Sequence, residues 1–315
     1  MIELAIIGMG PAAFSAAIYA ARYKISTKIF GMEPGGQMGK THFIENYPGF
    51  PEILGSELSQ KMQNHAKKFG VEIIIDRISK IKKKENKFKI YGDISGEQSV
   101  EYIILATGSK NKKLGIPGEK KFFGKGVTYC FTCDGPFFRH KKVGVVGGGD
   151  AAVRAAIFLA EIAEEVSIFL RRDVFRAEPV LVDNLRKKNN IKIFLQKEIK
   201  EILGQKKMES IILNNDEKIN LDGLFIEIGS VPESKITEGL GAKLTTSKHI
   251  IVDWQQQTSI NNLLAVGDVS SSGSRFEQIV TAISEGAMAA KTVFEHKQKN
   301  RPKRPPPHNN ASDPF

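Results

Sequence analysis

Two segments of this chain combine a short apolar strand, a glycine-rich turn and a helix, and this combination restricts the fold more than any other feature. In the first segment, a strand at residues 3–7 leads into the turn at 8–13 (GMGPAA) and then a helix. In the second, a strand at 143–146 leads into the turn at 147–152 (GGGDAA) and an apolar helix. Strand, glycine turn and helix in this order form the fingerprint of a dinucleotide site. We therefore predict an α/β fold with two Rossmann-like dinucleotide-binding domains.

The small residues of the first turn each have a physical role in binding a dinucleotide. Gly8 makes the tight turn, Gly10 lets the backbone approach a pyrophosphate, and Ala13 is small enough for the helix to pack on the strand. The helix N-terminus favours the bound anion. The following strand, 27–30, does not end in the acidic residue that usually binds the ribose, so Glu33 is the nearest candidate.

The second unit lies between two features that complete the first one. A strand at 102–105 runs into the turn at 106–109 (ATGS), and a late strand at 263–266 ends at 267–269 (GDV) before a long helix. The second domain is therefore predicted to be inserted into the first. The predicted boundaries are 1–112 plus 246–300 for the discontinuous first domain, 113–245 for the inserted domain and 301–315 for a basic, proline-rich tail.

Basic residues follow the strand at 166–170 and indicate which nicotinamide nucleotide binds. Arg171 and Arg172 stand where an acidic residue would accept hydrogen bonds from the ribose 2′-hydroxyl of NAD, and arginines there accommodate the 2′-phosphate of NADP instead. Arg176 is a third candidate. Exposed arginines at a strand end, with no ligand, are the alternative interpretation.

The two cysteines of the chain, Cys130 and Cys133, form one Cys-x-x-Cys motif. This spacing lets the sulfurs form and open a small ring, and it commonly lowers the pKa of one thiol. A zinc site would need a second cysteine pair or suitably spaced histidines, and the six histidines have no such spacing. Two unreactive buried thiols are a further alternative. We predict a redox-active pair and no metal site.

The composition is that of a soluble globular protein, with 41% hydrophobic and 26% charged residues among 315. No signal peptide or membrane span is expected, which predicts a cytoplasmic location, where such a cysteine pair is more often catalytic than structural. The net charge of +11 is spread over short basic runs that suit a solvated surface, and no nucleic-acid-binding motif accompanies them. The tail is predicted to be disordered, either without function or as an electrostatic tether.

Taken together, the motifs resemble those of the low-molecular-weight thioredoxin reductases over nearly the whole chain apart from the tail. The matching runs are GMGPAA at 8–13, GGQ at 35–37, ENYPG at 45–49, ATG at 106–108, CFTCDG at 130–135, the second glycine turn, RRDVFRA at 171–177 and GDV at 267–269. Their order and spacing together are specific, whereas one glycine turn alone is a weak signal. The resemblance implies a homodimeric flavoprotein that reduces thioredoxin with NADPH.

The resemblance also implies roles for individual residues. Cys133 would be the thiol nearest the flavin, Cys130 the thiol that attacks the thioredoxin disulfide, and Asp134 the acid/base group, although Asp134 also suits a plain turn. Asp268 would hold the ribityl chain of FAD. The residues assigned to FAD are Gly8, Gly10, Pro11, Ala12, Ala13, Glu33, Gly36, Gln37, Asn46, Thr107, Gly108, Gly267, Asp268, Gln278 and Ile279, and those assigned to NADPH are Gly147, Gly149, Asp150, Ala151, Arg171, Arg172 and Arg176.

Three positions depart from the family pattern: Leu170 stands where histidine is common, Glu277 where many relatives carry arginine, and Pro136 where an aromatic is common. Leu170 and Glu277 leave room for another electron donor, NADH or ferredoxin, on the same scaffold. A flavin-binding redox sensor or interaction protein with a basic tail is a second alternative. Because Cys133 and Gly147 are close in sequence, the dithiol and the nicotinamide are expected on one domain, which must swivel to serve a single flavin.

Overall fold

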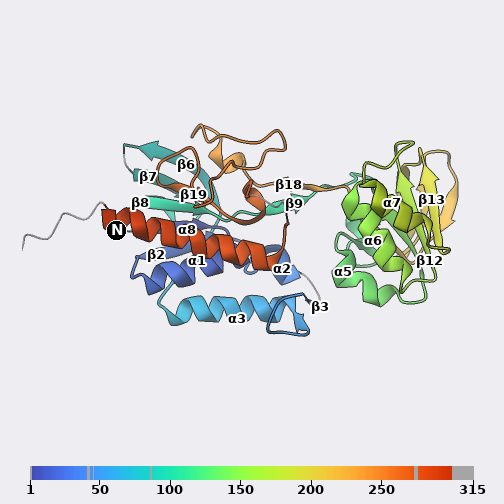
Figure 1. The fold of residues 1–315 in the computed structure, drawn as a ribbon, viewed down its shortest axis with the longest axis horizontal. Coiled ribbons are helices and arrows are strands. Elements are labelled where there is room, and N and C mark those ends of the chain that lie inside the picture. Colours follow the sequence, from blue (N-terminus) through green and yellow to red (C-terminus); the bar gives the residue numbers. More distant parts are fainter. Residues whose placement is uncertain (1, 41–42, 45, 86, 273–275, 300–315) are drawn as a thin grey trace, which may run out of the picture.

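The structure is a computed structural model that describes residues 2–40, 43–44, 46–85, 87–272 and 276–299. It has two lobes that lie side by side, each built on its own β-sheet (Figure 1). The predicted tail at 301–315 lies outside the described residues. In the described part of the chain, no helix is long and apolar enough to cross a membrane.

The larger lobe contains a seven-stranded sheet with the order β5-β2-β1-β8-β7-β6, and β19 pairs with β8 beside this path. The strands β5, β2, β1, β8 and β19 are parallel, whereas β6, β7 and β8 form an antiparallel meander. The strand bounds are β1 Ile2–Ile7, β2 Thr27–Gly31, β5 Glu72–Ile75, β6 Ile78–Lys84, β7 Lys87–Gly92, β8 Gly96–Leu105 and β19 Leu263–Ala265. A parallel sheet of this kind is the base of a dinucleotide-binding fold.

Small residues let two helices pack closely on this sheet. Helices α1 (Pro11–Arg22) and α8 (Ile279–Lys299) run side by side, as Figure 1 shows. A Cβ atom on Gly286 would lie 2.2 Å from the carbonyl oxygen of Ala12, so only glycine fits there. The remaining elements of the lobe are α2 (Gly36–Lys40), β3 (Phe43–Ile44), β4 (Ile53–Leu54), α3 (Gly55–Lys68) and the 3₁₀ turns Lys235–Thr237 and Gly267–Val269. The tight helix pair fixes where α1 begins, which is where the first glycine turn lies.

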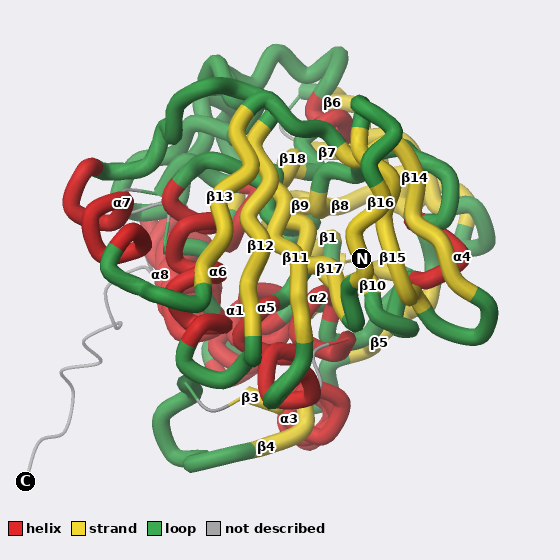
Figure 2. The backbone as a smooth tube through the Cα atoms, turned by 90° about the vertical axis from the view of Figure 1, so that its right-hand side faces the viewer, coloured by secondary structure: helices red, strands yellow, loops and turns green. Residues whose placement is uncertain are grey.

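The smaller lobe contains a five-stranded parallel sheet with the order β10-β17-β11-β12-β13 and a separate antiparallel sheet β14-β15-β16 (Figure 2). Its strands are β10 Val127–Thr128, β11 Lys142–Val146, β12 Glu165–Leu170, β13 Ile191–Leu195, β14 Ile199–Gly204, β15 Met208–Leu213, β16 Lys218–Asn220 and β17 Gly223–Ile226. Its helices are α4 Glu119–Phe122, α5 Phe131–Asp134, the 3₁₀ turn Gly135–Phe138, α6 Asp150–Ala160 and α7 Pro179–Arg186. The core between the sheet and α6 contains Val145, Val153, Leu159 and Phe225.

The two lobes are joined by a short antiparallel ladder between β9 (Ser109–Asn111) and β18 (Ser230–Pro232). The chain leaves the larger lobe through β9 and returns through β18, so the smaller lobe is an insertion. This confirms the predicted α/β architecture of two Rossmann-type units, one inserted into the other.

The chain after β18 belongs to the larger lobe. Ile236, Leu240 and Leu244 pack against the core of the seven-stranded sheet. The predicted inserted domain, 113–245, extends through these residues. We propose that the second boundary lies near β18 and that the first remains close to residue 112, because β9 and β18 pair with each other.

Candidate redox site with two dinucleotide turns

The first glycine turn connects β1 to α1 in a conformation that requires glycine at its first position. Gly8 has φ of +123°, and its N–H donates a hydrogen bond to the carbonyl oxygen of Phe30 at 2.8 Å. A Cβ atom at this position would lie 2.0 Å from the carbonyl oxygen of Ala106. The turn is therefore wedged between β2 and β8, with no space for a side chain.

Replacing Gly8 with alanine is expected to destabilise the protein by about 2–4 kcal/mol, through positive φ and overpacking together. For the stability of the protein without flavin, the Gly10→Ala variant is the matched control, because Gly10 has φ of −80° and a Cβ atom added there would meet no other protein atom within 4 Å. Thermal unfolding measures the change in stability of each variant, and the flavin content after purification measures whether it still binds the cofactor. Equal unfolding temperatures for wild type and Gly8→Ala would contradict the packing argument.

The space above Gly10 suits a pyrophosphate group. Gly10 is the N-cap of α1 and provides no side-chain cap, and Pro11 occupies the first turn. The N–H groups of the first turn are therefore free of side-chain caps, and a helix N-terminus favours an anion. Gly36 lies close to Gly10, since a Cβ atom built on Gly36 would lie 3.4 Å from the Cα of Gly10. Ala12 and Ala13 are buried below and pack α1 in place.

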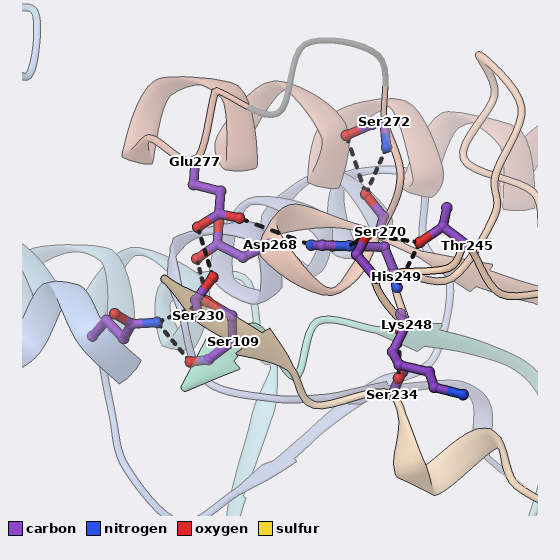
Figure 3. Close-up of polar contacts among 12 residues, drawn as sticks. Ser109, Ser230, Ser234, Thr245, Lys248, His249, Asp268, Ser270, Ser272 and Glu277 are labelled. Atoms are coloured by element: carbon purple, nitrogen blue, oxygen red, sulfur yellow. Dashed lines mark hydrogen bonds and ion pairs between the residues drawn. The ribbon is translucent and has the colours of Figure 1, made fainter. Parts of the chain in front are cut away.

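A chain of hydrogen bonds joins residues that the sequence assigned separately to FAD. The Gln37 side-chain amide donates to the backbone carbonyl of Ser109 at 2.6 Å and to the Ser109 hydroxyl at 3.2 Å. That hydroxyl lies 3.4 Å from Asp268 Oδ2 (Figure 3). Asn46 donates to Gln278 Oε1 at 3.0 Å. These contacts bring α2, β9 and the start of α8 around the carboxyl end of the sheet. Ser109, which was not among the predicted site residues, links Gln37 to Asp268, whereas Asn46 and Gln278 form a separate pair.

Other residues predicted for FAD lie at the edges of this arrangement. Glu33 forms an exposed ion pair with Lys40 at 2.5 Å. Thr107 donates its hydroxyl hydrogen to the carbonyl of Glu233 at 2.9 Å, and Gly108 accepts the N–H of Glu233 at 2.9 Å. Thr107 and Gly108 therefore fasten the end of β8 to the chain that returns from the smaller lobe. Ile279 begins α8 and packs beside the small cluster that contains Met38.

Carboxyl groups gather next to the Gln37–Ser109 chain. Burial, followed by the nearby Glu277 carboxylate, raises the pKa of Asp268 to about 6. Burial also raises the pKa of Glu277, which accepts a hydrogen bond from the Ser230 hydroxyl at 3.4 Å and lies 3.9 Å from His249 Nε2 (Figure 3). A cavity of about 170 Å³ adjoins Asp268 and Glu277. Glu277 therefore lies between the large lobe and β18, close to Asp268, the residue predicted to hold the ribityl chain of FAD.

The second glycine turn repeats the geometry of the first in the smaller lobe. Gly147 has φ of +143°, and a Cβ atom there would lie 2.3 Å from the carbonyl oxygen of Glu227. Gly149 is the N-cap of α6, has no side-chain cap and has open space at its Cβ position. Asp150 accepts the N–H of Glu178 at 2.9 Å, and Ala151 is exposed beside it. The turn therefore also fits a pyrophosphate.

Three arginines border this second turn. Arg171 and Arg172 follow β12 directly and are exposed, and the N–H of Arg176 donates to the carbonyl of Gly148 at 2.7 Å. Within the described part of the chain, no ion pair neutralises any of the three. Leu170, which replaces the common histidine, packs against Gly148, where an added Cβ would lie 2.9 Å from Leu170 Cδ2. The arginine side chains are therefore available to an anion.

The cysteine motif follows β10 on the same lobe. Cys130 is disulfide-bonded, and Cys133 is the other cysteine of the chain, although its side chain lies outside what the structure describes. The Thr128 hydroxyl donates a hydrogen bond to Asp134 and accepts the N–H of Cys130 at 3.1 Å. Thr128 thus connects the predicted acid/base residue to the backbone of the disulfide, a role that the sequence pattern did not reveal.

Two phenylalanines after the motif have different environments. Phe138 packs edge-on against Phe225, with ring centroids 5.2 Å apart, and therefore belongs to the core. The exposed fraction of Phe137 is 46%, so Phe137 is the remaining candidate for contact with a protein partner. Among the described residues, no group of three or more His, Cys, Asp or Glu side chains could hold a metal ion.

The chain matches a known protein family over most of its length. The sequence profile of the pyridine nucleotide-disulphide oxidoreductases matches residues 2–286. This chain belongs to the pyridine nucleotide-disulphide oxidoreductase family. Membership of this family implies a flavin and a pyridine nucleotide, in keeping with the two glycine turns and the disulfide.

Relatives in this family carry the name that the motifs suggested. The chain is 38% identical to thioredoxin reductase of Bacillus subtilis (strain 168) over 299 residues, which is 92% of this chain and 93% of the relative. It superimposes on the crystal structure of thioredoxin reductase from Streptococcus pyogenes with a TM-score of 0.80, at 36% identity, covering 94% of this chain and 98% of the other. It superimposes on the crystal structure of Lactococcus lactis thioredoxin reductase in its FR conformation with a TM-score of 0.74, at 35% identity, covering 95% of this chain and 100% of the other. The resemblance to thioredoxin reductases is therefore confirmed.

Proposed function

We propose that this protein is a thioredoxin-disulfide reductase, which passes electrons from NADPH through FAD and the Cys130–Cys133 pair to oxidised thioredoxin. The observation that supports this most is the placement of the disulfide-bonded Cys130 and the second glycine turn on one lobe. They follow β10 and β11, which flank the single strand β17. A nicotinamide and a disulfide carried by the same lobe can be presented in turn to one flavin in the larger lobe.

We assign each lobe one part of the reaction. The larger lobe would hold FAD through the turn at Gly8 and Gly10 and through Gln37 and Asp268, which are linked by Ser109. FAD, when bound, supplies the two-electron chemistry between the nicotinamide and the disulfide. In the smaller lobe, Arg171, Arg172 and Arg176 would bind the 2′-phosphate of NADPH, and Gly147, Gly149, Asp150 and Ala151 would border its pyrophosphate.

The proton balance gives Asp134 a task. NADPH delivers one hydride, and reducing a disulfide to two thiols requires two hydrogens, so one proton must be added for each turnover. Asp134 is hydrogen-bonded to Thr128, which in turn binds the Cys130 N–H, and it is the acid we assign to this proton. Cys133 would accept electrons from the flavin side and Cys130 would attack the thioredoxin disulfide.

The two-strand connection between the lobes gives the reaction a hinge. The disulfide and the nicotinamide site share the smaller lobe, and both must approach one flavin in the larger lobe. Rotation about the ladder of β9 and β18 would present them in turn. From the family resemblance we also propose a cytoplasmic homodimer, and sedimentation of the purified protein would test the dimeric state.

The first test is anaerobic mixing of the yellow protein with NADPH or NADH while the absorbance of oxidised flavin is followed. We expect fast bleaching with NADPH and slow bleaching with NADH, because the uncompensated arginines favour the 2′-phosphate. Equal rates would overturn the NADPH assignment. Bleaching by neither nucleotide would direct the search to ferredoxin or another donor. Subsequent oxidation of the reduced protein by thioredoxin tests the acceptor separately.

A further inference from the structure

Glu227 occupies a position next to the second glycine turn that the assigned roles leave unexplained. It follows β17 directly, and its N–H donates to the carbonyl of Val146 at 2.8 Å. Its carbonyl oxygen is the atom that leaves no space for a side chain on Gly147, at 2.3 Å. Glu227 is therefore in backbone contact with the first residue of the dinucleotide turn.

The other neighbour of β17 leads to the disulfide. In the parallel register between β10 and β17, Thr128 lies opposite Phe225. Cys130 and Glu227 each follow two residues later, at the same carboxyl edge of the sheet. Figure 2 shows β10, β17 and β11 as neighbours in this lobe. Glu227 thus lies between the segment that carries the disulfide and the segment that binds the dinucleotide.

The side chain of Glu227 is half-buried, and its carboxyl group has no partner among the described residues. Neither a hydrogen bond nor an ion pair to them is found, and burial raises its pKa to about 8. Burying an unpaired carboxyl group is costly, and buried polar groups in proteins usually have hydrogen-bond partners. An unpaired acid at the edge of a binding site therefore indicates that a ligand supplies the partner.

The strand order determines which half of a dinucleotide would reach Glu227. Arg171 and Arg172 follow β12, on one side of β11, and Glu227 follows β17, on the other side. In folds of this type the dinucleotide crosses the carboxyl ends of the strands, with its pyrophosphate at the glycine turn. When the arginines hold the adenosine 2′-phosphate, the nicotinamide half must extend over β17.

We propose that Glu227 binds the nicotinamide half of the pyridine dinucleotide through its carboxyl group, and that its ionised form favours the oxidised nucleotide. This inference rests on the proposed function, because it takes the second turn to be the NADPH site. The neutral acid can donate to and accept from the ribose hydroxyls or the carboxamide. The carboxylate would attract the positive charge that the nicotinamide ring carries once it is oxidised.

The pH dependence has a definite sign. Below pH 8 the Glu227 carboxyl group is mainly neutral, and above it mainly ionised, so the affinity for NADP⁺ should rise as the pH increases from 7 to 9. The 2′-phosphate of the nucleotide has a pKa near 6, so it is mostly ionised at pH 7 and changes little between pH 7 and 9. The charged groups on the surrounding elements include Asp134 on α5, Lys142 on β11, Asp150 and Arg154 on α6, and Lys112 near Gly229. They are unchanged in a Glu227→Gln variant, so the difference from wild type isolates Glu227.

The test is calorimetric titration of the oxidised flavoprotein with NADP⁺ at several pH values between 7 and 9. For wild type we expect the affinity to rise roughly two- to fivefold between pH 7 and 9, which corresponds to a decrease of about a half to one unit in the Glu227 pKa on binding. Glu227→Gln should show a flat profile, and so should Glu227→Ala if the first variant is poorly folded. Glu209→Gln, an exposed carboxylate on β15, is the matched control and should behave as wild type.

A fragment without the nicotinamide half separates the possible outcomes. Adenosine 2′,5′-bisphosphate should bind wild type and Glu227→Gln with equal affinity at every pH. A Glu227→Gln pH profile for NADP⁺ that matches wild type would overturn the assignment. So would a Glu227→Gln variant that loses as much affinity for the fragment as for NADP⁺. Absence of NADP⁺ binding to wild type would overturn the proposed function itself, and this inference with it. Bound flavin and the unfolding temperature establish that each variant is folded.

Discussion

Replacing Cys130 with serine is expected to abolish thioredoxin reduction, by a factor of at least about a thousand, while NADPH continues to reduce the bound flavin. The reason is chemical. A serine hydroxyl can neither form the disulfide in which Cys130 takes part nor attack a partner disulfide, since thiol–disulfide exchange requires a thiolate. The nicotinamide site and the flavin site lie on other elements, so their exchange of electrons does not depend on this sulfur.

Stopped-flow bleaching of the flavin by NADPH and steady-state reduction of thioredoxin measure the two steps. Thr132→Ala is the matched control, because the Thr132 hydroxyl lies 3.4 Å from the Cys130 sulfur but cannot exchange electrons. It should retain most of its thioredoxin activity. Cys133→Ser is expected to give the same loss as Cys130→Ser, because either change removes the disulfide. Thioredoxin reduction that survives either cysteine change would contradict the assigned route.

Much of the fold is predictable because local patterns determine it. The two glycine turns require positive φ at Gly8 and Gly147, and no other residue type avoids the backbone oxygens at 2.0 and 2.3 Å. The strands before these turns are short and apolar, so the sequence predicts them with nearly correct bounds. The insertion is predictable because the strand before Thr107 and the strand before Asp268 both complete the first sheet.

The second lobe boundary is harder to predict because it depends on tertiary contacts. The ladder of β9 and β18 has three residues on each side, which is too short for a periodic pattern to reveal. Gly241 is an attractive linker in the sequence, yet Leu240 and Leu244 on either side of it pack against the core of the large sheet. A glycine in a loop indicates a turn, but only packing decides to which lobe the turn belongs.

The site residues that the sequence did not reveal are polar residues without a motif. Ser109 joins Gln37 to Asp268, which are distant in the sequence. Thr128, on strand β10, joins Asp134, on helix α5, to the backbone of Cys130. Glu227 lies outside every motif of the chain. Such residues derive their roles from strand order and burial. The motifs located the site, whereas the connections within it had to come from the structure.

Replacing Arg171 and Arg172 together with glutamine is expected to raise the KM for NADPH roughly a hundredfold or more, with little change in the KM for NADH. Each arginine would lose a hydrogen bond to the charged 2′-phosphate, worth about 1.5–3 kcal/mol, and about 1.4 kcal/mol corresponds to a factor of ten. Both side chains are exposed and without ion pairs among the described residues, so their removal leaves no unpaired carboxylate behind.

The comparison of the two nucleotides makes this experiment specific. A general loss of folding or flavin would affect NADPH and NADH alike, whereas loss of phosphate recognition affects NADPH alone. The double variant Arg186→Gln with Lys187→Gln, at the exposed end of α7, removes the same charge from the same lobe and should leave both KM values nearly unchanged. If this control also weakened NADPH binding, the preference would come from the overall positive charge of the lobe. Equal effects of the Arg171 and Arg172 changes on both nucleotides would contradict the phosphate site, because a contact that NADH cannot make cannot contribute to its binding.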